Sequence, residues 1–290
     1  MQSTIAVTTP TVKAAKKVGI VQKILRNLQI AVGGTIIATF VLMAIFAPAI
    51  APQDPLSIAV QRRLQGPSEA HVLGTDELGR DVLSRLIHGA RISLMVGVVS
   101  TVMGGTAGVI LGIIAGYYGS FVDSILGRII DIMMALPGML LALAILTILG
   151  AGTFNTIIAI SIFAIPTFAR ITRGSTLNIK KLEYVDAIRA IGATDFRIIT
   201  RHIFPNIVSP IIVQATLYVA TAIVIAASLS FLGMGTQPPT PEWGTMLSNG
   251  REFMRQAPHL TLYPGIMILL VVLGFNLIGD GLRHLLEPKK

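Results

Sequence analysis

The stretch KKLEYVDAIRAIGATDFRIITRHIFPN, residues 180–206, is a charged island between long apolar runs. Its first half places Leu182, Val185 and Ile188 three residues apart, which is the spacing of one face of a helix. Gly192 then predicts a helix end, because glycine adopts the left-handed backbone conformation at little cost. The pattern therefore predicts two short amphipathic helices that meet in a bend at Gly192.

The second of these helices is expected to begin at Thr194, a suitable N-cap, with Asp195 at the positive end of the helix dipole. An apolar stripe with two arginines beside it follows along this helix. The stripe is Phe196, Ile199 and Ile203, and the arginines are Arg197 and Arg201. Pro205 is expected to stop the helix and to lead into the next apolar run. Such a bent segment at a membrane surface is predicted to be a docking device, the alternative being an amphipathic loop that lies on the lipid.

Composition places the whole chain in a membrane. Its 290 residues are 53% hydrophobic and only 13% charged, with a mean hydropathy of +0.75, far from the values of a soluble domain. The absence of cysteine excludes a disulfide framework and a thiolate metal site. The basic start of the chain leads into an apolar run too long for a cleaved signal, which predicts a retained anchor.

Apolar runs of about 20 residues can cross about 30 Å of hydrocarbon, and the chain is expected to form six such spans. They are predicted at residues 29–50, 92–117, 124–149, 154–171, 207–231 and 262–282. Pro137 and Gly138 are expected to kink the third span, and a proline-rich loop should precede the sixth. The predicted fold class is an all-α polytopic membrane protein. Its expected parts are a tail (1–28), a first span with an external segment (29–90) and a core (91–290) that contains the segment 180–206.

The second span carries glycines at intervals of four, which places them on one helix face. They are Gly104, Gly108, Gly112 and Gly116. We expect this face to admit a neighbouring helix of the same chain closely, rather than to serve a special pathway role. Upstream of this span, Thr75 or Asp76 is expected to cap a short helix ahead of Arg91.

Polar side chains in the last two spans are candidates for lining a transport pathway. They are Thr216, Tyr218, Thr221 and Ser228 in the fifth span and Asn276 in the sixth. Ordinary helix-packing hydroxyls would give the same pattern, so both readings stay open.

The distribution of the 23 Lys and Arg residues predicts the orientation. With the N-terminus inside, only seven of them fall in outer segments, and the segment between residues 170 and 201 alone places another seven on the inner side. This is the positive-inside bias, and it predicts that both termini and the segment 180–206 are cytoplasmic. Attraction to anionic lipid explains the net charge of +9 without a nucleic-acid partner.

Several kinds of chemistry are missing from the sequence. No Gly-Lys pair exists, so the chain has no phosphate-binding loop for ATP, and its five histidines lack metal-ligand spacing. Asp131 and Asp280 are expected to pair locally with Arg128 and Arg283 at the ends of their spans. Because no ionisable group is expected near mid-depth, an ion-coupled secondary transporter is a weaker alternative. A membrane-embedded enzyme is a second alternative, and no catalytic or cofactor residues are predicted.

A resemblance to a known family appears in the same segment. Asp186-Ala187-Ile188, Gly192 and His202-Ile203-Phe204-Pro205 follow the spacing E-A-A-x3-G-x9-I-x-L-P. This pattern resembles the coupling motif of permease subunits in bacterial ABC importers, with four letters substituted. Three further stretches are similar to C-type permeases of dipeptide and oligopeptide importers. They are LGTDELGRD (73–81), SFLGMG with QPPTPEWG (230–235 and 237–244) and FNLIGDGLR (275–283).

The resemblance implies a type I ABC importer permease fold, in the bacterial cytoplasmic membrane, with a cytoplasmic coupling helix. It implies a heterodimer with a B-type permease, two ATPase subunits that bind ATP and Mg²⁺, and an external substrate-binding protein. The residues expected to couple to the ATPase are Asp186, Ala187, Gly192, Phe196, Arg197, Ile199, Arg201, Ile203 and Pro205. Relatives carry dipeptides, longer peptides, glutathione or nickel chelates, and the sequence does not choose among these cargoes.

Overall fold

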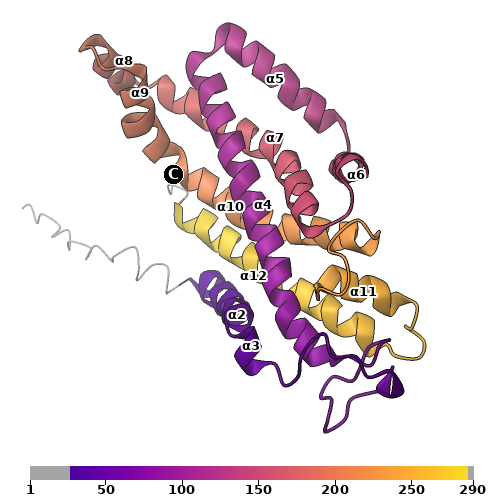
Figure 1. Cartoon of the computed structure of the whole chain (residues 1–290). Coiled ribbons are helices and arrows are strands. Elements are labelled where there is room, and N and C mark those ends of the chain that lie inside the picture. The colour runs from indigo at the N-terminus through magenta and orange to yellow at the C-terminus, as the bar shows by residue number, and fades with distance from the viewer. Residues whose placement is uncertain (1–26, 287–290) are drawn as a thin grey trace, which may run out of the picture.

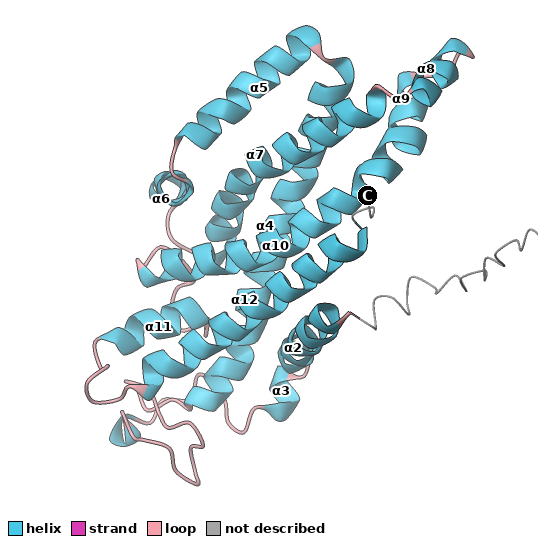
Figure 2. Cartoon of the chain, turned by 180° about the vertical axis from the view of Figure 1, so that it is seen from behind, coloured by secondary structure: helices cyan, strands magenta, loops and turns pink. Residues whose placement is uncertain are grey.

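A computed structural model describes residues 27–286, and in this range every regular element is a helix apart from one isolated bridge between Thr75 and Asp81 (Figures 1 and 2). The expected tail, residues 1–28, lies almost wholly outside the described range. The longer helices are α2 (Leu28–Ile45), α4 (Val82–Tyr118), α5 (Ser120–Ala135), α6 (Gly138–Leu149), α7 (Thr153–Lys180), α10 (Phe204–Phe231) and α12 (His259–Leu286). The shorter ones are α3 (Ala47–Ile50), η1 (Val60–Arg62), α8 (Glu183–Ala190), α9 (Asp195–Ile198), η2 (Ile199–Ile203) and α11 (Trp243–Arg251).

Five segments of the described chain are long and apolar enough to cross a membrane, and a sixth is obtained when α5 and α6 count as one bent span. The predicted kink at Pro137 is a complete break, because α5 ends at Ala135 and α6 begins at Gly138, at 91° to it. Proline disfavours a helical conformation at the residue before it, which explains the end of α5. The all-α membrane fold is confirmed.

In the described chain the most extensive contact between two helices is that of α4 with α7, and the glycine face of α4 makes it possible. A Cβ atom added at Gly108 would lie 2.5 Å from the carbonyl oxygen of Ile165, and one added at Gly112 would lie 2.5 Å from that of Ala169. Gly104 and Gly116 face α7 in the same way. The backbones of the two helices therefore approach until glycine hydrogens meet carbonyl oxygens, as predicted for packing within one chain.

Several helices extend beyond the predicted spans. α4 begins at Val82, ten residues before the predicted start of the second span, and runs for 37 residues, about 55 Å at helical rise. The expected boundary between the external segment (29–90) and the core (91–290) thus falls inside one unbroken helix. α7 continues nine residues past its predicted end, to Lys180. Part of the expected proline-rich loop is a helix, α11, capped by the Glu242 side chain.

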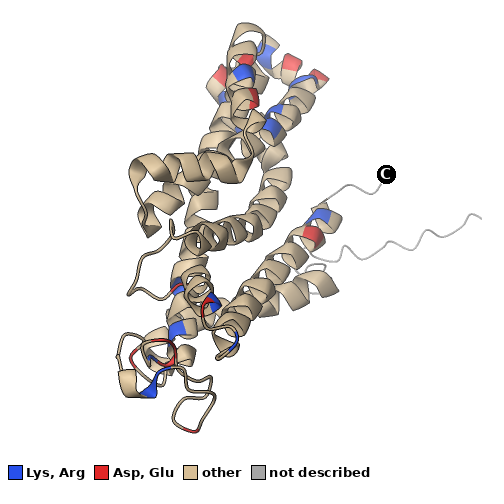
Figure 3. Cartoon of the chain, turned by 90° about the vertical axis from the view of Figure 1, so that its right-hand side faces the viewer, with Lys and Arg blue, Asp and Glu red and all other residues tan. Residues whose placement is uncertain are grey.

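Charged residues gather at the two ends of the bundle, with a few more near the end of α12, and the rest of the middle is almost free of them (Figure 3). At one end lie α8, α9 and the ends of α4 and α7; we call this the elbow end. At the other lie α3, η1, α11 and the loop between η1 and α4; we call this the loop end. The uncharged middle has the composition that the hydrocarbon core of a membrane requires.

The close contact between α4 and α7 predicts that one methyl group added on the glycine face destabilises the fold. We expect Gly108→Ala to lower the free energy of unfolding by about 1–3 kcal/mol, since the added carbon would overlap the backbone of α7. Thermal unfolding of the purified protein in detergent measures this loss. Gly34→Ala in α2 is the matched control, because an added Cβ there meets no atom within 4 Å. Equal unfolding midpoints for the two variants would contradict the packing role of the glycine face.

Candidate functional site

The segment predicted as a docking device forms a bent helical hairpin, which we call the elbow (residues 182–204). α8 ends at Ala190, and Gly192 follows with φ of 87°, the left-handed conformation predicted for it. The amide of Ala193 bonds back to the carbonyl of Ile188 at 3.3 Å, which closes the helix end. Thr194 caps α9 as predicted, its hydroxyl accepting the amide of Arg197 at 3.4 Å.

One face of the elbow is buried against the bundle. Val185, Ile198 and Ile203 are 0% exposed. They form a core cluster with Ile113 and Tyr117 near the end of α4 and with Ile207 on α10. The elbow therefore sits on the ends of α4 and α10 as a packed part of the bundle.

Pro205 does not stop the second helix, which corrects the sequence prediction. α9 runs through a π-helical turn, η2, directly into α10, so that residues 195–231 form one continuous apolar helix. In this turn the amide of Phe204 reaches back five residues to the carbonyl of Ile199. The carbonyl of His202 accepts the side-chain amide of Asn206 at 2.6 Å. The widened turn admits a proline, which has no amide hydrogen to donate.

The predicted apolar stripe is divided between core and solvent. Phe196 is 77% exposed, Ile199 is half-buried and Ile203 is fully buried, so Ile203 is not available for a partner contact in this structure. Ile191, which the sequence reading passed over, is 84% exposed beside Gly192. The remaining predicted coupling residues are all exposed: Asp186, Ala187, Gly192, Arg197, Arg201 and Pro205. The exposed face of the elbow thus offers Ile191 and Phe196 with arginines nearby.

Two ion pairs join α5 to α7. Both nitrogens of the Arg173 fork, Nε and Nη2, bind the two carboxylate oxygens of Asp123. Arg170 pairs with Asp131 at 3.0 Å. The expected pairing of Asp131 with Arg128 is wrong, because α7 lies alongside α5 and brings Arg170 to the carboxylate. These pairs hold α5 to α7, and beyond the break α6 packs on α7 through Ala142 and Leu146, which are fully buried.

The candidate pathway residues differ in their surroundings: three hydroxyls bond within their own helix, whereas Tyr218 is buried among aromatic rings. The hydroxyls of Thr216, Thr221 and Ser228 donate to backbone carbonyls four residues earlier, at 3.0, 3.3 and 2.8 Å. Ser228 also lines a hollow of about 310 Å³ between α6, α10, α11 and α12. Tyr218 is buried against the rings of Phe163 and Phe168, and its hydroxyl has no hydrogen-bond partner within the described range. Asn276 is half-buried in α12. A pathway role for these residues stays a prediction.

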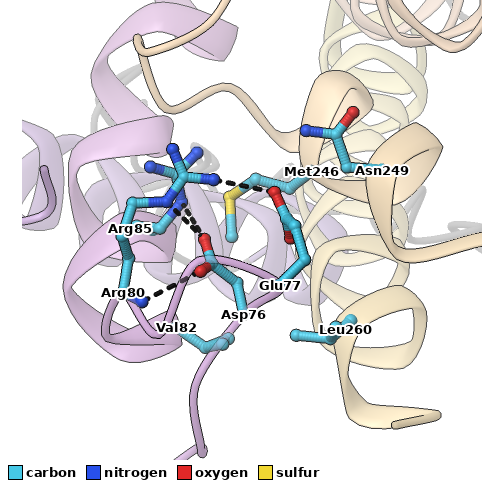
Figure 4. Close-up of a pocket in the computed structure, with 8 residues that line it drawn as sticks. All are labelled: Asp76, Glu77, Arg80, Val82, Arg85, Met246, Asn249 and Leu260. Carbon is cyan, nitrogen blue, oxygen red and sulfur yellow. Dashed lines mark hydrogen bonds and ion pairs between the residues drawn. The ribbon is translucent and has the colours of Figure 1, made fainter. Parts of the chain in front are cut away.

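The motif LGTDELGRD folds into a buried, charged turn at the loop end (Figure 4). Asp76 accepts the Nε of Arg80 at 2.6 Å and lies 3.3 Å from the Nε of Arg85, while Glu77 accepts the second nitrogen of Arg80. Asp81 caps α4 through the amide of Ser84 at 2.8 Å. The prediction that Thr75 or Asp76 is the cap is therefore wrong. The pairs surround a cavity of about 10 Å³, room for one water molecule.

The motif around Trp243 completes the loop end. Glu242 is buried and accepts the amides of Gly244 and Thr245 at 2.8 Å each, which caps α11. The indole of Trp243 is fully buried, donates to the carbonyl of Leu86 on α4 at 3.0 Å and packs edge-on against Phe40. The two loop-end motifs thus fix the beginning of α4 from both sides.

Comparisons with known proteins agree with this arrangement. Residues 108–290 match the family model described as binding-protein-dependent transport system inner membrane component. Residues 20–67 match the N-terminal TM domain of oligopeptide transport permease C.

Curated relatives match along most of the chain. The dipeptide transport system permease protein DppC of Alkalihalophilus pseudofirmus is 48% identical over 91% of this chain and 87% of that protein. The glutathione transport system permease protein GsiD of Pectobacterium atrosepticum is 45% identical over 92% and 89%. GsiD of Escherichia coli is 50% identical over 86% and 82%.

Solved structures of transporters share the fold. An inward-facing structure of the MetNI methionine ABC transporter covers 70% of this chain and 97% of its own, with a TM-score of 0.57 and 19% identity. A structure of an amino acid ABC transporter with histidines covers 69% and 94%, with a TM-score of 0.53 and 15% identity. At these identities the likeness shows the fold alone.

Proposed function

Because the chain belongs to the family of binding-protein-dependent transport system inner membrane components, we propose how its parts carry out the work of that family. The chain is a permease subunit of an ABC importer and a multi-pass inner-membrane protein. It is not itself an enzyme, since ATP hydrolysis in such importers sits in separate ATPase subunits. The proposal concerns the elbow, the orientation, the partners and the cargo.

The elbow is the proposed docking element for an ATPase subunit. The observation that carries this is the exposed pair Ile191 and Phe196 at the tip of a segment whose other face is locked into the bundle. Large apolar side chains in water are typical anchors of a protein interface. Arg197 and Arg201 lie exposed on the same segment and would orient the partner. ATP-driven closure of the ATPases would then push the elbow and shift the bundle between inward-open and outward-open states.

The elbow end is proposed to be cytoplasmic, with both termini on the same side. When both termini are counted on this side, 16 of the 23 Lys and Arg residues of the sequence fall there, which matches the positive-inside bias. The loop end, with its buried ion pairs and Trp243, would then face outward and meet the substrate-binding protein. The partners are a B-type permease, which completes a heterodimer, and two ATPase subunits.

The cargo is proposed to be a dipeptide, an oligopeptide or glutathione. The support is the names of the relatives, which are given for dipeptide and for glutathione transport. These cargoes share a peptide backbone with free charged ends, so one class of pathway would serve them. The ion-coupled alternative has no comparable support.

Cysteine cross-linking tests the docking directly, since the chain has no native cysteine. We expect Phe196→Cys, labelled through its thiol with a maleimide that carries a benzophenone, to form an adduct with an ATPase subunit of the assembled complex on irradiation, because excited benzophenone inserts into C–H bonds of whatever protein lies against it. Val72→Cys is the control, because Val72 is 58% exposed in the loop between η1 and α4, at the opposite end. An adduct at position 72 but none at position 196 would overturn both the docking and the orientation.

A substitution at the bend tests whether its geometry matters. A side chain at Gly192 meets open space, so the only cost is the left-handed backbone, about 1–2 kcal/mol for an ordinary residue. We expect Gly192→Val to insert normally but to hydrolyse ATP without uptake. Gly192→Asn should keep coupling, because asparagine tolerates this conformation.

Gly66→Val is the matched control for Gly192→Val, since Gly66 also has open space around it but no left-handed backbone. Normal uptake by Gly192→Val at equal expression would count against the role of the bend.

The cargo class is tested by uptake into vesicles that contain the complete importer. We expect labelled dipeptide or glutathione to accumulate only when ATP is present inside, and a protonophore to leave the uptake unchanged. Accumulation that follows an ion gradient in the absence of ATP would contradict the proposal.

A further inference from the structure

Four segments of the chain meet on one side chain at the end of α4. Tyr117 is the next-to-last residue of that helix and is only 3% exposed. Its ring belongs to the cluster that buries the inner face of the elbow. Polar groups from α7, α8 and α9 reach the same residue, although all of them lie more than 60 positions away in sequence.

The hydroxyl of Tyr117 connects the two arms of the elbow. It donates to Oδ1 of Asp195 on α9 at 2.5 Å, and it accepts from Nη2 of Arg189 on α8 at 3.4 Å. One oxygen atom therefore bridges the helix before Gly192 to the helix after it. The backbone carbonyl of Tyr117 in turn accepts Nζ of Lys180, the last residue of α7, at 2.6 Å.

The ring of Tyr117 adds a second kind of contact. Nζ of Lys180 lies 5.6 Å from the ring centroid and the guanidinium carbon of Arg189 lies 5.7 Å from it. Both distances are within the range of a cation–π attraction. Phenylalanine would provide this ring, but only tyrosine provides the hydroxyl bridge as well.

Two tyrosine hydroxyls bridge the arms of the elbow: the buried one of Tyr117, and the exposed one of Tyr184 on α8, which donates to the carbonyl of His202 at 3.4 Å. Gly192 has open space where a side chain would stand, so no side-chain packing at the bend itself helps to fix the direction in which α9 leaves α8. Apolar packing of Val185 and Ile198 is non-directional and holds the arms down without setting their angle. Hydrogen bonds to charged groups are directional and stronger than neutral ones.

We propose that Tyr117 is a positioning residue that sets the angle of the elbow and carries its movement into α4. This inference rests on the proposed function, since it takes the elbow to be the element that the ATPase pushes. A force on the tip at Ile191 or Phe196 reaches the Tyr117 hydroxyl through either arm. From there it passes to the helix that runs the length of the bundle and contacts α7 through its glycine face.

The test compares Tyr117→Phe with Tyr118→Phe in the complete importer reconstituted with its ATPase and binding-protein subunits. Tyr118 is half-exposed, packs edge-on against Tyr117 and makes no hydroxyl hydrogen bond within the described residues. The readout is substrate taken up per ATP hydrolysed, at equal amounts of assembled complex. For Tyr117→Phe we expect this ratio to fall about ten-fold, the scale of one lost hydrogen bond to a charged group. Tyr118→Phe should keep the parent ratio.

Variants of Asp195 separate positioning from simple packing. Asp195→Ala should lower the ratio as Tyr117→Phe does, and the double variant should fall no further, because both remove the same bond. Asp195→Asn keeps an acceptor oxygen and should restore most of the ratio relative to Asp195→Ala. An unchanged ratio in Tyr117→Phe, or losses that multiply in the double variant, would overturn the inference.

The cross-link at Phe196→Cys separates this inference from the docking on which it rests. An intact adduct in the Tyr117→Phe background with an unchanged ratio removes only the role of Tyr117. Absence of the adduct in the parent complex removes the docking and the inference together.

Discussion

The rest of the structure depends on the contact between the glycine face of α4 and the backbone of α7. Gly108 and Gly112 bring carbonyl oxygens of α7 to within 2.5 Å of where a Cβ would stand. Inside a bilayer, apolar side chains gain little by leaving lipid for protein, so close van der Waals packing must hold the helices together. Interhelical distance is therefore set by the absence of side chains on one face. This contact fixes the position of α4 against α7, and the end of α4 is part of the surface on which the elbow packs.

The elbow and the helix ends on which it packs form one continuous packed unit. The inner face of the elbow packs on Ile113 and Tyr117, and the π-helical turn at 199–203 merges its second arm into α10. The first arm follows α7 directly, across two residues. A displacement at the elbow tip is thus transmitted to three long helices at once. At the opposite end, buried pairs of Asp76 with Arg80 and Arg85 hold the start of α4 in place. Leaving such buried charges unpaired would be costly, which makes that end a stable anchor.

The sequence predicted the elements that depend on local or periodic signals. Apolar runs located the spans, the glycine spacing located the α4 face, and Gly192 with Thr194 located the bend and its cap. It did not predict which side of the second arm is buried. Helical periodicity places Phe196 and Ile203 on one stripe, but whether each residue meets core or solvent depends on how the arm runs into α10.

Long-range contacts explain the remaining differences. The start of α4 is polar in sequence, and it is helical because Asp81 caps it and the loop-end turn buries its arginine. Asp131 pairs with a residue 39 positions away rather than with its neighbour. The sequence did not indicate a role for Tyr117, since its partners on α7, α8 and α9 come together only after folding. The central claim is that the elbow and α4 move as one body. Pulsed electron paramagnetic resonance on the reconstituted importer measures this, with spin labels on cysteines replacing Glu183 on α8 and Ile110 on α4. The account predicts the same distance distribution between these labels with and without trapped ATP, and a distribution that shifts when ATP is trapped would contradict it.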